Sequence, residues 1–402
     1  MQKTLLTFLG KGRDDASTGY RLAQYVFPDG VVRRTAFFGL ALADFVRPGV
    51  LVLLGTAGSM WSVLLESLAV GGEDEALRLE LMEAECAGRV DQPLLDRVAS
   101  LLSRSVGLEV RPSVIPAGEN AEEQVAILAT IARVVPEGVP LEIDVTHGFR
   151  HLGMVGLLSA ELIARLRPGT EVQALWYAAL DMTREGRTPV VSLSGLKVVQ
   201  QWVRALDRFD ANNDYGVFAP LLLSDGLPAD KAKCLSMAAS FEGISNVSDA
   251  ARQLRTVLPS LDQPLRGASE LFRTALRRRL EWARLGDLSQ QQLVLARRAM
   301  EREDLLRAVI FGLESWLTRL CVQQGKDPLD YIVREQVDVW FQSEIKAGNI
   351  SDQERLDYWN LKNLRNAMAH GTVPSIRFLQ QLMQNPVRLQ AEIGAILKRI
   401  GA

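Results

Sequence analysis

The chain has 402 residues, of which 48% are hydrophobic and 23% charged, with 46 Lys and Arg against 48 Asp and Glu and a formal net charge of −2. This composition excludes a disordered, fibrous or highly charged protein. Because the charges balance, any contact with nucleic acid depends on local groups and not on a global field. The length predicts at least two domains, each able to bury a core.

Cysteine usage and hydrophobicity indicate the cellular compartment in which we expect the protein. Its three cysteines lie far apart without a CxxC pair, which argues against a disulfide framework and suits the reducing cytoplasm. The N-terminal apolar run is too short for a signal peptide. The longest uncharged stretch, 48–65, is interrupted by glycines and hydroxyl residues, so we expect no membrane span and a cytoplasmic location.

The first half of the chain alternates short apolar runs with helical patterns. Strands are predicted at 4–9, 50–54, 109–115, 141–145 and 171–177, and helices at 38–45, 59–68, 94–105, 119–134 and 148–166. The tripeptide Pro28-Asp29-Gly30 separates two β-rich runs and predicts a β-hairpin over 20–36. This alternation is typical of an α/β domain with a mostly parallel sheet covered by helices.

The second half contains helical patterns alone. Strand signals stop after residue 193, and the clearest helices are predicted at 266–285, 289–323 and 352–370. We therefore expect an α/β domain over residues 1–194 and an all-α domain over residues 195–402.

Three of the predicted strands run into small and polar residues. They are followed by Gly10-Lys11-Gly12-Arg13, by Gly55-Thr56-Ala57-Gly58-Ser59-Met60-Trp61, and by Val145-Thr146-His147-Gly148-Phe149-Arg150-His151. Ligands gather at the carboxyl edge of a parallel sheet, where loops expose backbone N–H groups. The first segment is also compatible with a simple tight turn, and Ser59 with the N-cap of the following helix. The third favours function, because a buried core has no use for two histidines and an arginine.

These segments resemble a known sensor family. Asp144-Val145-Thr146-His147-Gly148-Phe149-Arg150, with Leu54-Gly55-Thr56 before Ser59 and Trp61, and Thr7-Phe8-Leu9-Gly10 at the N-terminus, resembles the Rossmann-like CARF domain of accessory proteins in type III CRISPR systems. The resemblance implies a pocket for a cyclic oligoadenylate, with cyclic tetra-adenylate favoured. Its lining would be Gly10, Lys11, Gly12, Arg13, Thr56, Ser59, Met60, Trp61, Thr146, His147, Gly148, Phe149 and Arg150.

Charge and symmetry fit such a ligand. A cyclic oligonucleotide has phosphodiesters around a symmetric ring, so two copies of one sheet edge at a two-fold axis can each hold half of it. Lys11, Arg13 and Arg150 would face phosphates, and His147 would hydrogen-bond to adenine or stack on it. We expect a homodimer, with higher assembly left open.

A second candidate site lies near the end of the chain. Arg365 and Asn366 precede His370 and Gly371 on the predicted helix 352–370. At 100° per residue Asn366 and His370 lie about 40° apart, whereas Arg365 lies about 140° from His370. Gly371 is the expected stop signal, so His370 falls in the last turn. Taken alone, the pattern is equally compatible with a histidine that caps the helix.

In an all-α domain joined to a CARF domain, Arg365-Asn366 followed by His370 resembles the HEPN ribonuclease motif. The resemblance implies that Arg365 and His370 of two protomers form one composite site, with Asn366 in support. No cofactor or metal is expected for this chemistry, since the nucleophile is the 2′-OH of the RNA and no metal-ligand cluster stands out in the sequence.

The function expected from both motifs is a cyclic-oligoadenylate-activated endoribonuclease for single-stranded RNA. It would act on RNA alongside a type III CRISPR complex that makes the messenger, leaving a 2′,3′-cyclic phosphate and a 5′-OH. Two alternatives stay open: a catalytically silent messenger-binding regulator, and a ring nuclease that degrades its own messenger.

Overall fold

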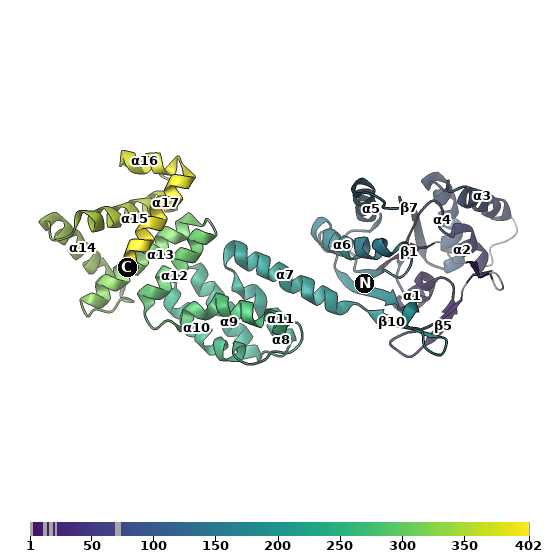
Figure 1. The fold of residues 1–402 in the computed structure, drawn as a ribbon, viewed down its shortest axis with the longest axis horizontal. Coiled ribbons are helices and arrows are strands. Elements are labelled where there is room, and N and C mark those ends of the chain that lie inside the picture. Colours follow the sequence, from purple (N-terminus) through teal and green to yellow (C-terminus); the bar gives the residue numbers. More distant parts are fainter. Residues whose placement is uncertain (1–2, 11–13, 16–18, 21, 69–73, 402) are drawn as a thin grey trace. The chain divides into compact units, whose positions relative to one another are not determined.

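The computed structural model describes residues 3–10, 14–15, 19–20, 22–68 and 74–401. The chain divides into two compact units, Met1–Lys197 and Val198–Ala402 (Figure 1). The division falls within helix α7 (Ser194–Asn212), three residues after the boundary expected at residue 194.

The first unit is built on an eight-stranded sheet with the order β5-β4-β10-β9-β8-β1-β6-β7. Strands β9, β8, β1, β6 and β7 run parallel, whereas β10 is antiparallel to β9. The strands are β1 (Thr4–Leu9), β4 (Ala23–Val26), β5 (Val32–Thr35), β6 (Val50–Gly55), β7 (Glu109–Val114), β8 (Leu141–Asp144), β9 (Val172–Ala178) and β10 (Arg187–Ser192). This confirms the predicted fold class of a mostly parallel sheet with a β-hairpin.

The hairpin extends one edge of this sheet. Strands β4 and β5 pair antiparallel, and β4 pairs in parallel with β10. The peptide N–H of Gly30 donates to the Phe27 carbonyl oxygen at 2.9 Å, and Gly30 has a φ of +82° that favours glycine. A separate two-stranded ribbon consists of β2 (Asp14–Asp15) and β3 (Gly19–Tyr20).

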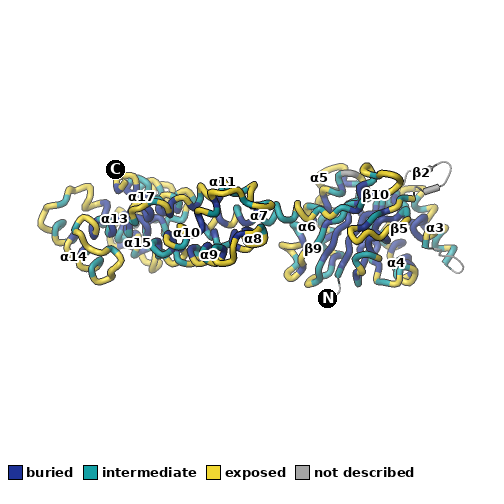
Figure 2. Tube along the Cα trace, turned by 90° about the horizontal axis from the view of Figure 1, so that it is seen from below, coloured by how far each residue is buried: buried dark blue, intermediate teal, exposed yellow. Residues whose placement is uncertain are grey.

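Helices cover both faces of the sheet. They are α1 (Phe38–Val46), α2 (Trp61–Ser67), α3 (Glu75–Cys86), α4 (Gln92–Val106), α5 (Ala121–Val134) and α6 (Arg150–Leu166). Strand β1 alternates between the two layers: Leu5 and Leu9 pack with residues of α1, α2 and α4, whereas Leu6 and Phe8 pack with residues of α5 and α6. Figure 2 shows the buried strands enclosed by these helices.

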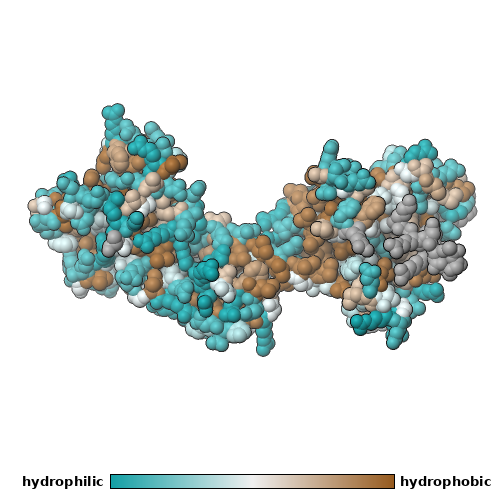
Figure 3. All heavy atoms as spheres, viewed as in Figure 1, coloured by the Kyte–Doolittle hydropathy of each residue, from teal (hydrophilic) through white to brown (hydrophobic). Residues whose placement is uncertain are grey.

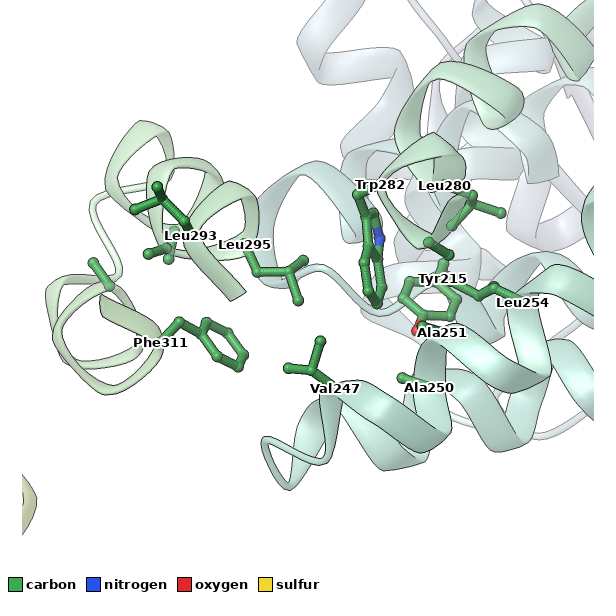
Figure 4. Packing of buried hydrophobic residues seen from close by; sticks show 14 of the residues in the cluster. Tyr215, Val247, Ala250, Ala251, Leu254, Leu280, Trp282, Leu293, Leu295 and Phe311 are labelled. Atoms are coloured by element: carbon green, nitrogen blue, oxygen red, sulfur yellow. The ribbon is translucent and has the colours of Figure 1, made fainter. Parts of the chain in front are cut away.

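The second unit is helical throughout its described residues. It contains the rest of α7, then η3 (Tyr215–Phe218), α8 (Ala219–Ser224), α9 (Ala229–Gly243), α10 (Val247–Leu261), α11 (Ser269–Leu280), η4 (Glu281–Arg284), α12 (Leu288–Glu301), α13 (Leu305–Gln323), α14 (Tyr331–Ala347), α15 (Asp352–His370), α16 (Arg377–Met383) and α17 (Pro386–Ile400). One continuous core joins them, in which Val247, Leu254, Trp282 and Phe311 are buried (Figure 4).

The helix predicted over 289–323 is wrong as a single element. Helices α12 and α13 are separate, and the chain turns at Glu303, which has a φ of +60°. Asp304 then caps α13, because its side chain accepts from the Arg307 N–H at 3.1 Å. No glycine or proline marks this turn. The helix predicted over 352–370 is confirmed as α15.

None of the helices within the described ranges is both long enough and apolar enough to cross a bilayer.

Candidate functional site

The described parts of the three polar segments lie at one edge of the sheet in the first unit. Strand β1 pairs in parallel with both β6 and β8, with Thr4 opposite Val50 on one side and Leu141 on the other. The ends of β8, β1 and β6 are therefore adjacent, and the chain leaves all three in the same direction. Gly10, Thr56–Trp61 and Val145–Phe149 follow from these ends, as the sequence predicts.

The segment after β6 is hydrogen-bonded to the end of β1. The Ser59 hydroxyl donates to the Leu9 carbonyl oxygen at 2.8 Å and accepts from the Thr56 N–H at 2.9 Å. The Met60 N–H donates to the Gly10 carbonyl oxygen at 3.2 Å. The interpretation of Ser59 as an N-cap is wrong, because Met60 precedes α2 and makes no side-chain cap. Ser59 instead joins two strand ends.

The indole of Trp61 is also hydrogen-bonded to the segment after β6. Its Nε1–H donates to the Thr56 carbonyl oxygen at 2.9 Å, and the side chain is almost fully buried. A Cβ at Gly55 would lie 2.6 Å from Trp61 Cζ2, so the approach of strand and ring requires glycine. Trp61 therefore holds the backbone of Thr56 in place, and its expected contact with a ligand stays a prediction.

A buried carboxyl organises the segment after β8. Asp144 accepts from the Thr7 hydroxyl at 2.6 Å and from the Thr146 N–H at 2.8 Å. The Thr146 hydroxyl accepts from the Ala178 N–H at 2.8 Å. Burial raises the pKa of Asp144, although these hydrogen bonds and nearby His147 act in the opposite direction. Thr7, from the N-terminal string that carries the resemblance, thus joins this network, and Ala178 is a member that no sequence signal indicated.

The His147 ring lies against the start of α1. Its Nε2 accepts from the Phe38 N–H at 3.4 Å, beside an apolar cavity that Phe37 and Leu64 also line. Burial lowers the pKa of His147, which favours the neutral ring that this acceptor role requires. The ring is thus engaged within the protein, and its expected contact with adenine stays a prediction.

Two glycines bring the ends of β1 and β8 close together. A Cβ at Gly10 would lie 3.0 Å from the Gly148 nitrogen, and Gly148 has a φ of +96°. Next to it, Phe149 is 49% exposed, and its ring stacks on His151 with centroids 5.8 Å apart. The edge therefore offers closely packed backbone and one exposed aromatic ring to a ligand.

Some predicted ligand residues lie outside the described part of the chain. These are Lys11, Gly12 and Arg13, and also the side chain of Arg150, whose backbone begins α6. Their expected contacts with phosphate stay predictions.

The second candidate site lies at the end of α15 in the helical unit. Arg365 and His370 are exposed, Asn366 is half-buried, and Arg365 Nη1 donates to Asn366 Oδ1 at 2.9 Å. The helix ends as predicted: Gly371 has a φ of +63°, and its N–H donates to the Ala367 carbonyl oxygen. The three residues thus lie within the last two turns, with Arg365 and His370 accessible to other molecules.

A lysine one turn earlier extends this polar surface. Lys362 Nζ donates to Asp338 Oδ2 of α14 at 2.6 Å and to the Tyr358 hydroxyl at 3.0 Å. Burial and the neighbouring Asp338 raise the pKa of Tyr358, so the phenol stays protonated. Lys362 lies four residues before Asn366, and residues with this i, i+4 spacing are neighbours on one helix face. From this spacing Lys362 could have been predicted to lie beside the site.

Comparison with known proteins gives one informative similarity. The chain is similar to the CRISPR-associated protein MJ1674 of Methanocaldococcus jannaschii. The two are 23% identical over 288 residues, which covers 65% of this chain and 44% of that protein. The chain therefore spans less than half of this relative's length. No protein-family model matches the chain. The similarity links the chain to a CRISPR-associated protein and assigns no activity to either site.

Proposed function

We propose that this protein is a cyclic-oligoadenylate-activated endoribonuclease that cleaves single-stranded RNA in type III CRISPR defence. The observation that carries the proposal is the exposed pair of Arg365 and His370 on the last turns of α15, in a chain whose other unit joins three polar segments at one sheet edge. The similarity to a CRISPR-associated protein supports the same setting.

The sheet edge suits a cyclic oligonucleotide. Backbone groups at Gly10, Thr56 and Gly148 lie at adjacent strand ends, and such ends bind phosphates and nucleobases through N–H groups. The internal hydrogen bonds of Ser59 and Asp144 preorganise these segments. Little ordering is then left for the ligand to impose.

The end of α15 suits phosphodiester cleavage. The 2′-oxygen attacks the adjacent phosphorus, the P–O5′ bond breaks, and a 2′,3′-cyclic phosphate and a 5′-OH result. His370 takes the proton from the 2′-OH or gives one to the leaving 5′-oxygen. Arg365 stabilises the negative charge that builds on the phosphoryl oxygens. The bond from Arg365 to Asn366 orients the guanidinium.

A second copy of the chain completes this site. Arg365 and His370 point about 140° apart on the helix, so one copy alone presents them to different sides. Two α15 ends that meet across a two-fold axis bring an arginine and a histidine from different copies together. The messenger activates the enzyme if it binds the cleaving arrangement of the dimer more tightly than the resting one.

Cleavage of a labelled single-stranded RNA by the full chain tests the proposal. With cyclic tetra- or hexa-adenylate present, we expect cleavage that EDTA does not inhibit and products that carry a cyclic phosphate. His370→Ala should reduce the rate by roughly 10²–10⁴. Arg277→Ala, at an exposed arginine of α11, is the matched control and should cleave normally.

Two results would point to other functions. Messenger binding without RNA cleavage under any condition would leave a silent regulator. Linearisation of the messenger that persists in His370→Ala would identify a ring nuclease.

A further inference from the structure

A pocket lies on the helical unit beside the proposed catalytic helix. It is lined by α15, by the start of α16 and by α17, and its volume is about 500 Å³. Leu356 and Trp359 of α15 line it together with Ile376 and Phe378. Phe378 is 43% and Ile376 40% exposed, so the pocket opens to the surface. Figure 3 shows hydrophobic residues among hydrophilic ones in this part of the unit.

The chain reversal after His370 builds this pocket. Gly371 ends α15 in a left-handed conformation, and the Thr372 N–H donates back to the Ala367 carbonyl oxygen at 2.9 Å. The Gln380 side chain then donates to the Pro374 carbonyl oxygen at 2.8 Å and holds the connection to α16. The segment directly after the catalytic motif therefore returns Ile376 and Phe378 to the side of α15.

One polar side chain in the pocket has no partner. Asn360 is only 8% exposed and lines the pocket, yet its amide makes no hydrogen bond to any residue within the described ranges. The amide atoms of Asn360 retain access to the open pocket, so they can donate to and accept from the hydrogen-bonding edge of a ligand there. The carboxylate of Glu392 on α17 lines the same pocket and adds an acceptor.

The pocket lies on the face of α15 that carries Asn366 and His370, whereas Arg365 lies about 120° from Trp359. At 100° per residue Trp359, Asn366 and His370 lie within about 40° of one another. At 1.5 Å per residue Trp359 precedes Asn366 by about 10 Å along the axis. A strand of RNA whose phosphate lies at His370, opposite the arginine of a second copy, can therefore place a nearby base in the pocket.

We infer that this pocket binds an unpaired base of the RNA substrate and prefers bases with an exocyclic amino group. The inference rests on the proposed ribonuclease function. The rings of Trp359 and Phe378 offer faces on which a base stacks. The Asn360 and Glu392 oxygens accept from an amino group of adenine, cytosine or guanine, which uracil lacks. The pocket thus selects where the strand is cut.

The other candidate occupant is a second copy of the chain. The apolar rim of Leu356, Ile376 and Phe378 would suit it. The unpartnered amide and the carboxylate favour a polar edge instead, because a dimer contact would bury both at a cost unless it supplied donors.

Binding and cleavage experiments on the full chain test this inference. Fluorescence anisotropy with His370→Ala protein and the probes A6, C6 and U6 should show tighter binding of A6 and C6 than of U6. Adding Phe378→Ala or Asn360→Ala should reduce that difference at least fivefold. Val387→Ala, which removes an apolar side chain that is 77% exposed on α17, is the matched control and should keep the difference.

Sequencing of the ends made from a random RNA pool by messenger-activated protein, with His370 intact, gives the second readout. Amino-bearing bases should be enriched at one position near the cut, and Phe378→Ala should remove that enrichment. Equal binding of all three probes, or an unchanged base preference in both pocket variants, would overturn the inference while cleavage itself persists.

Failure of the proposed function gives a different pattern. In one such pattern, the preference for A6 and C6 depends on Asn360, but the messenger-treated protein cleaves no RNA. The pocket would then be a base-binding site, and the proposed ribonuclease activity would be excluded. If Phe378→Ala instead turns a dimer into a monomer in light scattering and leaves probe discrimination intact, the pocket holds a second copy and the inference is wrong.

Discussion

The sheet edge of the first unit and the end of α15 in the second differ in how far their polar groups are buried and hydrogen-bonded. At the sheet edge, Asp144 and Ser59 are buried and hydrogen-bonded inside the unit. At the end of α15, Arg365 and His370 are exposed, and the described partner of Arg365 is its neighbour Asn366. The polar groups of the sheet edge are thus satisfied within one chain, whereas those at the end of α15 are left accessible to a second molecule.

The largest effect that separates the two regions is expected at Asp144. Asp144→Ala removes the acceptor of both the Thr7 hydroxyl and the Thr146 N–H. Two buried donors lose their partner, so the free energy of unfolding should fall by about 4 kcal/mol in urea denaturation. His370→Ala should change it by less than about 0.5 kcal/mol, because the side chain is exposed. Equal losses in both variants would contradict the comparison.

The helical unit also contains a buried carboxyl away from its surface site. Glu242 is 3% exposed and accepts from the Asn213 amide, and burial raises the pKa of Glu242 from 4.5 to about 7. Below pH 4.5 this carboxyl is protonated in the folded and the unfolded chain alike. As the pH rises to 7, the unfolded chain loses the proton while the folded one keeps it. This group therefore lowers the free energy of unfolding by about 3 kcal/mol over that window.

Glu242→Gln should remove this pH dependence, since the amide keeps the acceptor oxygen for Asn213 and does not ionise. Thermal unfolding of both proteins from pH 4 to pH 8 measures the difference. We expect the variant to be the more stable of the two above pH 7. Parallel curves would show that the carboxyl does not titrate in this range.

A smaller effect is expected where two strand ends are joined. Ser59→Ala removes the bond to the Leu9 carbonyl oxygen and the acceptor of the Thr56 N–H. The free energy of unfolding should fall by about 2 kcal/mol. Calorimetric titration with cyclic tetra-adenylate should also show weaker binding, because the segment after β6 is no longer held. Thr274→Ala, at an exposed hydroxyl of α11, controls for the loss of a hydroxyl and should bind normally.

Elements with strong local signals were predictable from the sequence. Strand β1 was predictable, because Leu5, Leu6, Phe8 and Leu9 make it a short and mostly apolar run. Helix α15 was predictable too, because Ser351 caps its start by accepting from the Glu354 N–H at 3.3 Å and Gly371 follows its end. The turn at Glu303 was not, since a glutamate at φ +60° gives no sequence signal and its conformation comes from tertiary packing.

The candidate sites also contain some features that could be predicted from the sequence and others that could not. The strand ends that meet at the sheet edge follow from topology, so Gly10, Thr56 and Thr146 could be grouped from the sequence. The inward direction of His147 and the hydroxyl bridge of Ser59 depend on side-chain packing between strands distant in sequence. The pocket at Asn360 depends on the path of the chain after Gly371, and residue patterns do not specify that path.

The strand order also bears on how the chain is made. Strand β1 lies inside the sheet, yet Thr4 pairs with Leu141, a residue that is synthesised much later. In the hairpin, Gln24 likewise pairs with the much later residue Arg187. On the ribosome the first apolar strand therefore emerges long before its neighbours and exposes unpaired edges. Such segments fold slowly and aggregate readily. Overproduction should thus benefit from slow translation or added chaperones, and fragments that end before β10 should be insoluble.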